Sequence, residues 1–99
     1  MRIVLRQGAW SDLEEISRWY SEQREELALD FEAELFKTLN VVANAPKQYG
    51  VWNKRFRRVR LPRFPYFVVY RAEAERVVVF ALIHTRRGSR TIARKLRRK

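Results

Sequence analysis

Residues 66–84 read YFVVYRAEAERVVVFALIH and carry the strongest structural signal in the chain. Two runs rich in β-branched and aromatic residues, 66–71 and 76–84, are joined by the short polar segment AEAE. This pattern predicts a β-hairpin. Because both runs are apolar on both faces, we expect the hairpin to lie at the centre of a sheet and to be covered on each side.

The residues before Pro46 predict two helices. A capping box, Ser11-x-x-Glu14, predicts that the first helix begins at Ser11, after a break at 7–9. Residues 21–26 either form a turn or continue this helix, and Pro46 ends the second. The apolar positions at helical spacing are Leu13, Ile16 and Tyr20, followed by Ala28, Phe31, Leu35, Leu39 and Val42. Together they predict a helical hairpin that covers one face of the sheet.

Shorter strands are predicted at 3–6 and 56–61, so the element order is β-α-α-β-β-β. We expect an α+β fold in which a small, mostly antiparallel sheet packs on the helical hairpin, as one domain over residues 1–99. Trp10 and Trp19 are expected to pack between helix and sheet. The last ten residues form a basic tail, and Ser89 is placed to act as the N-cap of a short helix there. Either this tail or a partner chain is expected to cover the second face of the sheet.

Charge is divided unevenly along the chain. Residues 1–50 contain 6 Lys/Arg and 9 Asp/Glu, whereas residues 51–99 contain 16 Lys/Arg and 2 Asp/Glu. The second half should therefore attract a polyanion or an acidic protein. The chain has no cysteine and no apolar run long enough to cross a membrane. We expect a soluble cytoplasmic protein with no membrane partner.

Arg58 and Arg60 are the first candidate site residues. Side chains two apart on a strand share a face, so the two guanidiniums should lie side by side and suit adjacent phosphates or carboxylates. The alternatives are a solvated edge strand or contact with an acidic partner. Another charged group, Asp12, Glu14, Glu15 and Glu22, is expected to be a solvated helix face that complements the helix dipole.

His84 is the second candidate, at the end of the last predicted strand. It is the only histidine, which excludes a metal site built on histidines, and we predict neither a metal nor a cofactor. The neighbouring Arg86 and Arg87 disfavour its protonated form. His84 is suited to act as a general base, but a structural hydrogen-bonding role is favoured by its position.

The chain resembles the RelE/ParE superfamily of toxins from type II toxin–antitoxin systems. The resemblance covers nearly the whole length and depends on several short motifs in a fixed order. These are Ala28-x-x-Phe31-x-x-x-Leu35-x-x-x-Leu39, Pro46, Gly50, Arg60-Leu61, Phe64 to Tyr70, Val77 to Phe80, and His84-Thr85-Arg86-Arg87. It implies the fold predicted above and a toxin–antitoxin hetero-oligomer, in which an acidic or amphipathic antitoxin segment covers the toxin.

RelE-like members of this superfamily are metal-independent, ribosome-dependent mRNA endonucleases. The resemblance places Arg58, Arg60 and Arg87 at basic positions of the RelE-like site, with His84 as a substitute for proton transfer. Two positions depart from that pattern: Phe67 occupies the place of an arginine, and no tyrosine follows Tyr70. Electrostatic stabilisation by the three arginines is still compatible with RNA cleavage.

The run Phe64 to Tyr70 and the His-x-Arg-Arg ending are more similar to ParE-like members, which bind and inhibit DNA gyrase. We therefore predict gyrase inhibition, with RNA cleavage on the ribosome as the alternative. A third hypothesis is a non-catalytic nucleic-acid-binding protein that uses the basic tail. In the binding interpretations, the residues that contact the target or nucleic acid are Arg55, Arg57, Arg86, Arg90 and Arg94.

Overall fold

The computed structural model describes residues 1–52 and 55–87, which form two helices and four strands in the predicted order. The α+β fold is therefore confirmed. The basic tail, with Arg90 and Arg94, lies outside the described residues. The elements are β1 (Arg2–Leu5), α1 (Gln7–Gln23), α2 (Glu25–Asn44), β2 (Arg57–Arg60), β3 (Tyr66–Ala72) and β4 (Arg76–His84).

The strands form one mixed sheet in the order β1-β4-β3-β2. The hairpin of β3 and β4 is central, as its apolar faces predicted. β3 pairs with β4 on one side and with β2 on the other, and both pairings are antiparallel. β1 pairs with β4 in parallel. The register shifts within the hairpin, because Val69 pairs with Ala81 but Tyr70 pairs with Val79. Phe80 is thus an extra residue in β4, and this bulge lets it lie on the same face as Ala81.

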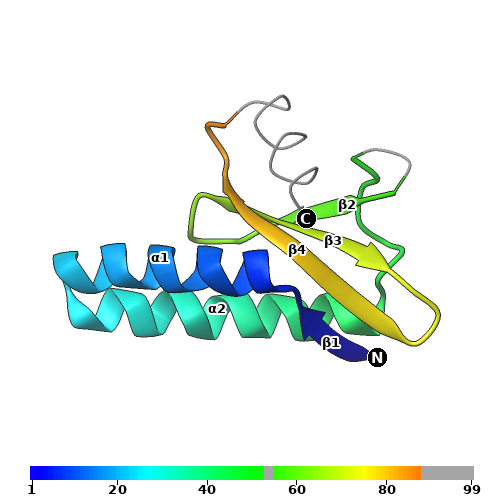
Figure 1. Cartoon of the computed structure of the whole chain (residues 1–99), viewed down its shortest axis with the longest axis horizontal. Helices are drawn as coiled ribbons and strands as arrows, with labels where there is room; N and C mark the ends of the chain where they lie inside the picture. The colour runs from blue at the N-terminus through cyan, green and yellow to red at the C-terminus, as the bar shows by residue number, and fades with distance from the viewer. Residues whose placement is uncertain (53–54, 88–99) are drawn as a thin grey trace.

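The helices lie side by side on one face of the sheet, and their connected ends extend past it (Figure 1). All five apolar positions of the second helical stripe are buried, and Phe31, Leu35, Leu39 and Val42 are completely inaccessible to solvent. They pack with Val68, Tyr70, Val77, Val79 and Leu82 of the central strands. The sheet's other face carries a smaller buried cluster of Val69, Ala81 and Ile83, against which Trp52 and Phe56 pack.

The first helix begins earlier than its capping box predicted. α1 begins at Gln7, directly after β1, and its N-cap residue Arg6 makes no side-chain capping bond. The backbone explains the early start: the Arg6 N–H donates to the Val79 carbonyl, and the Arg6 carbonyl accepts from Ala9. Ala9 is completely buried, so packing against the sheet extends the helix beyond the point that local capping chemistry favours.

Asp12 was wrongly assigned to a solvated face. Its side chain is only 6% exposed, and its Oδ2 accepts a hydrogen bond of 3.0 Å from the Leu82 backbone N–H. β1 ends at Leu5, opposite Val79, so beyond that point β4 has no strand on its side away from β3. Asp12 supplies the acceptor that a longer β1 would have supplied. The other three acidic residues of this group are exposed, as predicted.

Trp10 and Trp19 do not pack between helix and sheet: they are 46% and 55% exposed. Trp19 contacts Tyr20 edge to face, and Tyr20 rather than Trp19 reaches Phe31 and Phe64 in the core. The polar stretch at 21–26 contains the break between the helices at Arg24, whose backbone is extended. In the described part of the chain, neither helix has the length and apolar character needed to span a membrane.

Candidate target-binding surface

Arg58 and Arg60 lie on β2, at an edge of the sheet. Arg58 pairs with Val69 and Arg60 pairs with Phe67, so both hold register positions on the face away from the helices, as strand alternation predicted. At the edge of the sheet, Arg60 also lines a groove between β2 and α2. The Arg58 guanidinium lies over the Phe67 ring, 4.4 Å from its centroid. This cation–π contact holds Arg58 against the sheet in a defined orientation. Arg60 is exposed, and its Nη1 donates to the Leu61 carbonyl at 2.9 Å.

Arg57 points to the opposite face, where it pairs with Tyr70. Its Nη1 donates to the carbonyl oxygens of Tyr49 (2.8 Å) and Lys47 (3.1 Å). The Tyr70 hydroxyl donates to the Pro46 carbonyl at 2.7 Å. Burial raises the pKa of Tyr70 to about 12, although the nearby Arg57 opposes this rise. These bonds attach the loop after α2 to the sheet.

His84 faces the helices. It pairs with Tyr66, and the two rings meet edge to face with centroids 5.2 Å apart. Its Nδ1 accepts a hydrogen bond of 3.1 Å from the Arg86 backbone N–H, so the neutral imidazole carries its proton on Nε2. In this tautomer Nε2 is a hydrogen-bond donor. His84 thus has a defined hydrogen bond and ring contact, and its role stays a prediction.

Arg87 lies beside His84, in a groove between α1 and the ends of β3 and β4. Both residues line this groove of about 490 Å³, together with Trp19 and Tyr66. Burial raises the pKa of Tyr66, while the positive charge of Arg87 partly offsets that rise. Arg87 is therefore close enough to Tyr66 to influence its ionisation.

The candidate residues of the RelE-like site are thus divided between the two faces of the sheet. Arg58 and Arg60 lie on the face away from the helices, whereas His84 and Arg87 line the groove beside α1. Arg55 and Arg86 are exposed. This arrangement gives two separate surfaces, and the groove is of mixed charge because Glu15 and Glu22 line it together with Arg18 and Arg87.

A cationic cavity of about 420 Å³ lies between the loop after α2, the start of β2 and the end of β3. Arg55 and Arg57, which the sequence singled out, contribute to it, and so do two residues that sequence analysis missed. These are Lys47 and Arg71, which are 24 positions apart in the chain. No spacing rule connects them, because only the folding of the loop onto β2 and β3 brings them together.

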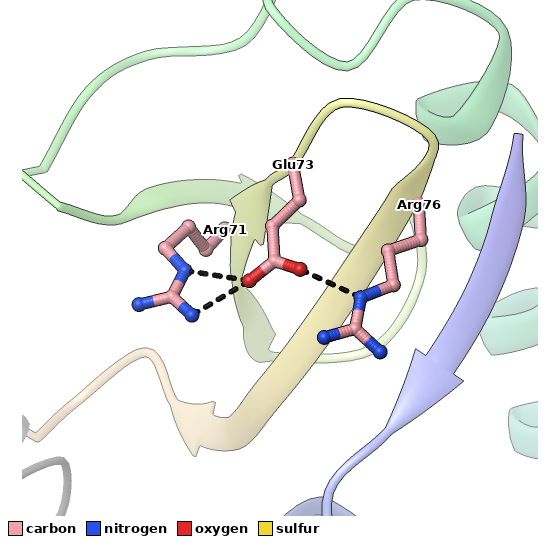
Figure 2. A network of polar contacts seen from close by, with 3 residues as sticks. All are labelled: Arg71, Glu73 and Arg76. Carbon is pink, nitrogen blue, oxygen red and sulfur yellow. Dashed lines mark hydrogen bonds and ion pairs between the residues drawn. The ribbon is translucent and has the colours of Figure 1, made fainter.

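Arg71 belongs to a small ionic network at the turn of the central hairpin. Figure 2 shows the Glu73 carboxylate between two guanidiniums: Oε2 accepts from Arg71 (2.6 Å to Nη2), and Oε1 accepts from Arg76 at 2.6 Å. The hydrogen bonds from Arg76, and then those from Arg71, lower the pKa of Glu73. Arg71 also lies over the Phe80 ring at 5.3 Å. Within the described ranges, no group of three or more His, Cys, Asp or Glu side chains is arranged to hold a metal ion.

Comparison with known proteins identifies the family. The family model for the ParE toxin of the type II toxin–antitoxin system parDE matches residues 3–88. The chain belongs to the ParE toxin family. This assignment makes it a toxin of a type II toxin–antitoxin system and confirms the resemblance to the RelE/ParE superfamily.

A solved structure agrees with the fold expected for a ParE toxin. A chain of the chromosomal ParDE toxin–antitoxin system from P. aeruginosa superposes with a TM-score of 0.75 and is 17% identical in sequence. The match covers 85% of this chain and 95% of the other. At this identity the similarity demonstrates a shared fold. No curated protein sequence matches the chain at a significant level.

Proposed function

We propose that this ParE toxin arrests bacterial growth by binding and inhibiting DNA gyrase in the cytoplasm. The observation that supports binding over RNA cleavage is that the candidate catalytic residues lie on two different faces of the sheet. Arg58 and Arg60 lie on the sheet face opposite the one that His84 occupies. General acid–base chemistry at one phosphodiester needs its proton-transfer group and its electrostatic groups around the same reacting atoms.

Phe67 supports the same proposal. It stands where the RelE-like pattern has an arginine, and its ring lies under the Arg58 guanidinium. The guanidinium of Arg58 stacked on the half-buried ring of Phe67 forms a contact surface with a cationic and an aromatic part, above the buried residues Val69 and Ile83. Surfaces of this composition are frequent in protein interfaces, where aromatic residues and Arg are enriched.

We further propose that a cognate antitoxin neutralises the toxin by covering the groove between α2 and β2. The apolar lining of this groove of about 540 Å³ comes from Ala33, Val41, Val59 and Pro62, and the lining also includes the charged residues Glu34, Lys37, Arg60 and Arg63. Val41 is 50% exposed, and Leu29 on the same helix is 63% exposed. An amphipathic antitoxin segment would bury these apolar side chains, as helix-in-groove complexes do.

The test is a supercoiling assay with purified gyrase and relaxed plasmid. We expect the toxin to block supercoiling and Arg58→Ala with Arg60→Ala to weaken the block at least about tenfold, as loss of two interface arginines commonly does. The matched control removes two positive charges elsewhere, by Arg18→Gln with Lys37→Gln, and should inhibit like the wild type. Normal supercoiling at saturating toxin would refute the proposal.

Ribosome-dependent mRNA cleavage is the second candidate function, and the paired guanidiniums of Arg58 and Arg60 favour it. It predicts new 5′ ends within translated codons minutes after induction of the toxin. Mapping of 5′ ends in cellular mRNA therefore separates the two functions. Growth arrest without such ends supports gyrase inhibition.

A further inference from the structure

We propose that Phe67 is a positioning residue, whose ring holds the Arg58 guanidinium in the orientation in which Arg58 contacts the target of the toxin. This role rests on the proposed function in one respect, that Arg58 belongs to the target-binding surface, and it is the same whichever target the toxin binds. Activity would then depend on an uncharged side chain that acts through its neighbour.

The ring of Phe67 is the contact that orients Arg58. The Arg58 guanidinium lies 4.4 Å from the ring centroid, well within the distance at which an aromatic face attracts a cation. In the parts of the chain that the structure describes, no oxygen atom accepts a hydrogen bond from the Arg58 side chain. All of its N–H donors therefore remain for a partner, while the stacked ring restricts the rotation of an otherwise flexible side chain.

Neighbouring guanidiniums of β2 and β3 are held by oxygen atoms instead. Arg57 and Arg60 donate to backbone carbonyls. Arg71 donates to the Glu73 carboxylate, which also balances its charge. Arg58 differs from these three arginines in both respects, because an aromatic face orients it and no bonded carboxylate neutralises it.

Phe67 is itself held by the centre of the sheet. It lies on β3, between β2 and β4, and pairs with Arg60 on one side and with Ile83 on the other. Ile83 is completely buried, and Phe67 is half-buried. A ring fixed in this way transmits the rigidity of the sheet to the guanidinium that is stacked on it. An arginine that is oriented before binding loses less entropy when it binds.

The test compares removal of the ring with removal of the charge, in bacteria that lack the antitoxin. Phe67→Leu removes the aromatic face and keeps an apolar side chain, whereas Phe67→Tyr keeps the ring. Phe36→Leu is the matched control, because it makes the same change at a partly exposed position of α2. The activity measured is the amount of toxin per cell, quantified by immunoblot, that halves the growth rate.

We expect Phe67→Leu to raise the amount of toxin required by about three- to tenfold, as loss of a cation–π contact and of an ordered arginine commonly weakens binding. Phe67→Tyr and Phe36→Leu should act like the wild type. Undiminished toxicity of Phe67→Leu would overturn the proposal. So would an equal loss in Phe67→Tyr, because the aromatic face would then not be the feature that matters.

A double-mutant cycle separates positioning from direct contact or from a general effect on folding. If the ring acts through Arg58, Phe67→Leu should cause no further loss of toxicity in an Arg58→Ala background. It should keep its full effect in an Arg60→Ala background, since the Leu61 carbonyl holds Arg60. A further loss in the Arg58→Ala background would overturn the proposal, because the ring would then contact the target itself or support the fold.

Nuclear magnetic resonance of the isotopically labelled toxin detects the stacking without any target. The ring current of Phe67 should move the Arg58 Nε–H proton to high field, and this shift should disappear in Phe67→Leu. An unshifted proton in the wild type would overturn the proposal. Growth arrest that depends on Phe67 and Arg58 together, with normal supercoiling by gyrase, would support this role and refute gyrase inhibition. Undiminished toxicity of Arg58→Ala would overturn both the role of Phe67 and the target-binding surface.

Discussion

Asp12 illustrates how one buried carboxylate completes the edge of a sheet. It accepts the Leu82 N–H on the side of β4 away from β3, beyond the end of β1. Asp12→Ala leaves that N–H without an acceptor, so we expect a loss of about 1–3 kcal/mol in the free energy of unfolding. Asp12→Asn keeps an acceptor oxygen and should lose less. Urea denaturation measures both.

The control for Asp12 is Glu14→Ala, two positions along the same helix, where the side chain is exposed. This change should alter the free energy of unfolding by no more than about 0.5 kcal/mol. If Asp12→Ala is equally mild, the hydrogen bond to Leu82 does not stabilise the fold.

Tyr70 gives the protein a specific sensitivity to alkali. Its pKa is raised to about 12 in the folded protein, mainly by burial, against a usual value of about 10. The unfolded chain therefore loses this proton first, and the corresponding stability is complete below about pH 10 and is lost as the pH rises toward 12. Tyr70→Phe removes the titrating hydroxyl. We expect its stability to fall less steeply than that of the wild type between pH 10 and 12.

Circular dichroism during urea titrations at several pH values checks this expectation. Tyr70→Phe also loses the hydrogen bond to the Pro46 carbonyl, so at pH 8 the variant should be less stable by about 1 kcal/mol. Parallel stability curves for the two proteins from pH 10 to 12 would contradict the role of Tyr70.

At the scale of elements, α2 is the helix that carries the core. Leu35 is completely buried between the helix pair and the sheet, whereas Leu29 on the same helix is 63% exposed. Leu35→Ala should reduce the free energy of unfolding by about 2–5 kcal/mol, because it removes buried methyl groups and leaves a cavity. Leu29→Ala is the matched control and should change stability by less than about 0.5 kcal/mol.

Leu29→Ala, which should barely change stability, tests the proposed antitoxin surface instead. Leu29→Ala should weaken the complex if the antitoxin covers the exposed side of α2, and titration calorimetry measures this. Unchanged affinity would move the antitoxin to another surface.

The loop between β2 and β3 is fastened to α2 by one carboxylate. Glu34 is only 7% exposed, and its two oxygens accept from the backbone N–H (2.8 Å) and Nε (2.7 Å) of Arg63. The hydrogen bond and charge of Glu34 raise the pKa of Arg63. This tie holds the end of β2, and with it Arg60, in a fixed position relative to the helices.

For the whole molecule, the dominant property is a formal net charge of +11, concentrated in the second half of the sequence. Association with an acidic antitoxin should therefore be accelerated by long-range attraction. Between about 50 and 500 mM salt, we expect the association rate to fall at least about tenfold while the dissociation rate changes much less. Stopped-flow fluorescence separates the two rates, and an association rate that is independent of salt would refute this expectation.

The sequence by itself determined the elements whose period was unambiguous. The strands 66–71 and 76–84 and the buried stripe from Ala28 to Val42 agree with the structure closely, because local spacing and burial favour the same arrangement there. The shared face of Arg58 and Arg60 also followed from strand alternation alone.

Only the tertiary structure decided the features that depend on contacts distant in sequence. The start of α1 at Gln7 and the burial of Asp12 follow from contacts with β4, about 70 positions later in the chain. The separation of His84 from Arg58, and the meeting of Lys47 with Arg71, were decided by strand register and by the folding of the loop after α2. The periodicity of a segment predicts which side of its own helix or strand a residue occupies. Packing of the whole chain decides which other residues contact it there.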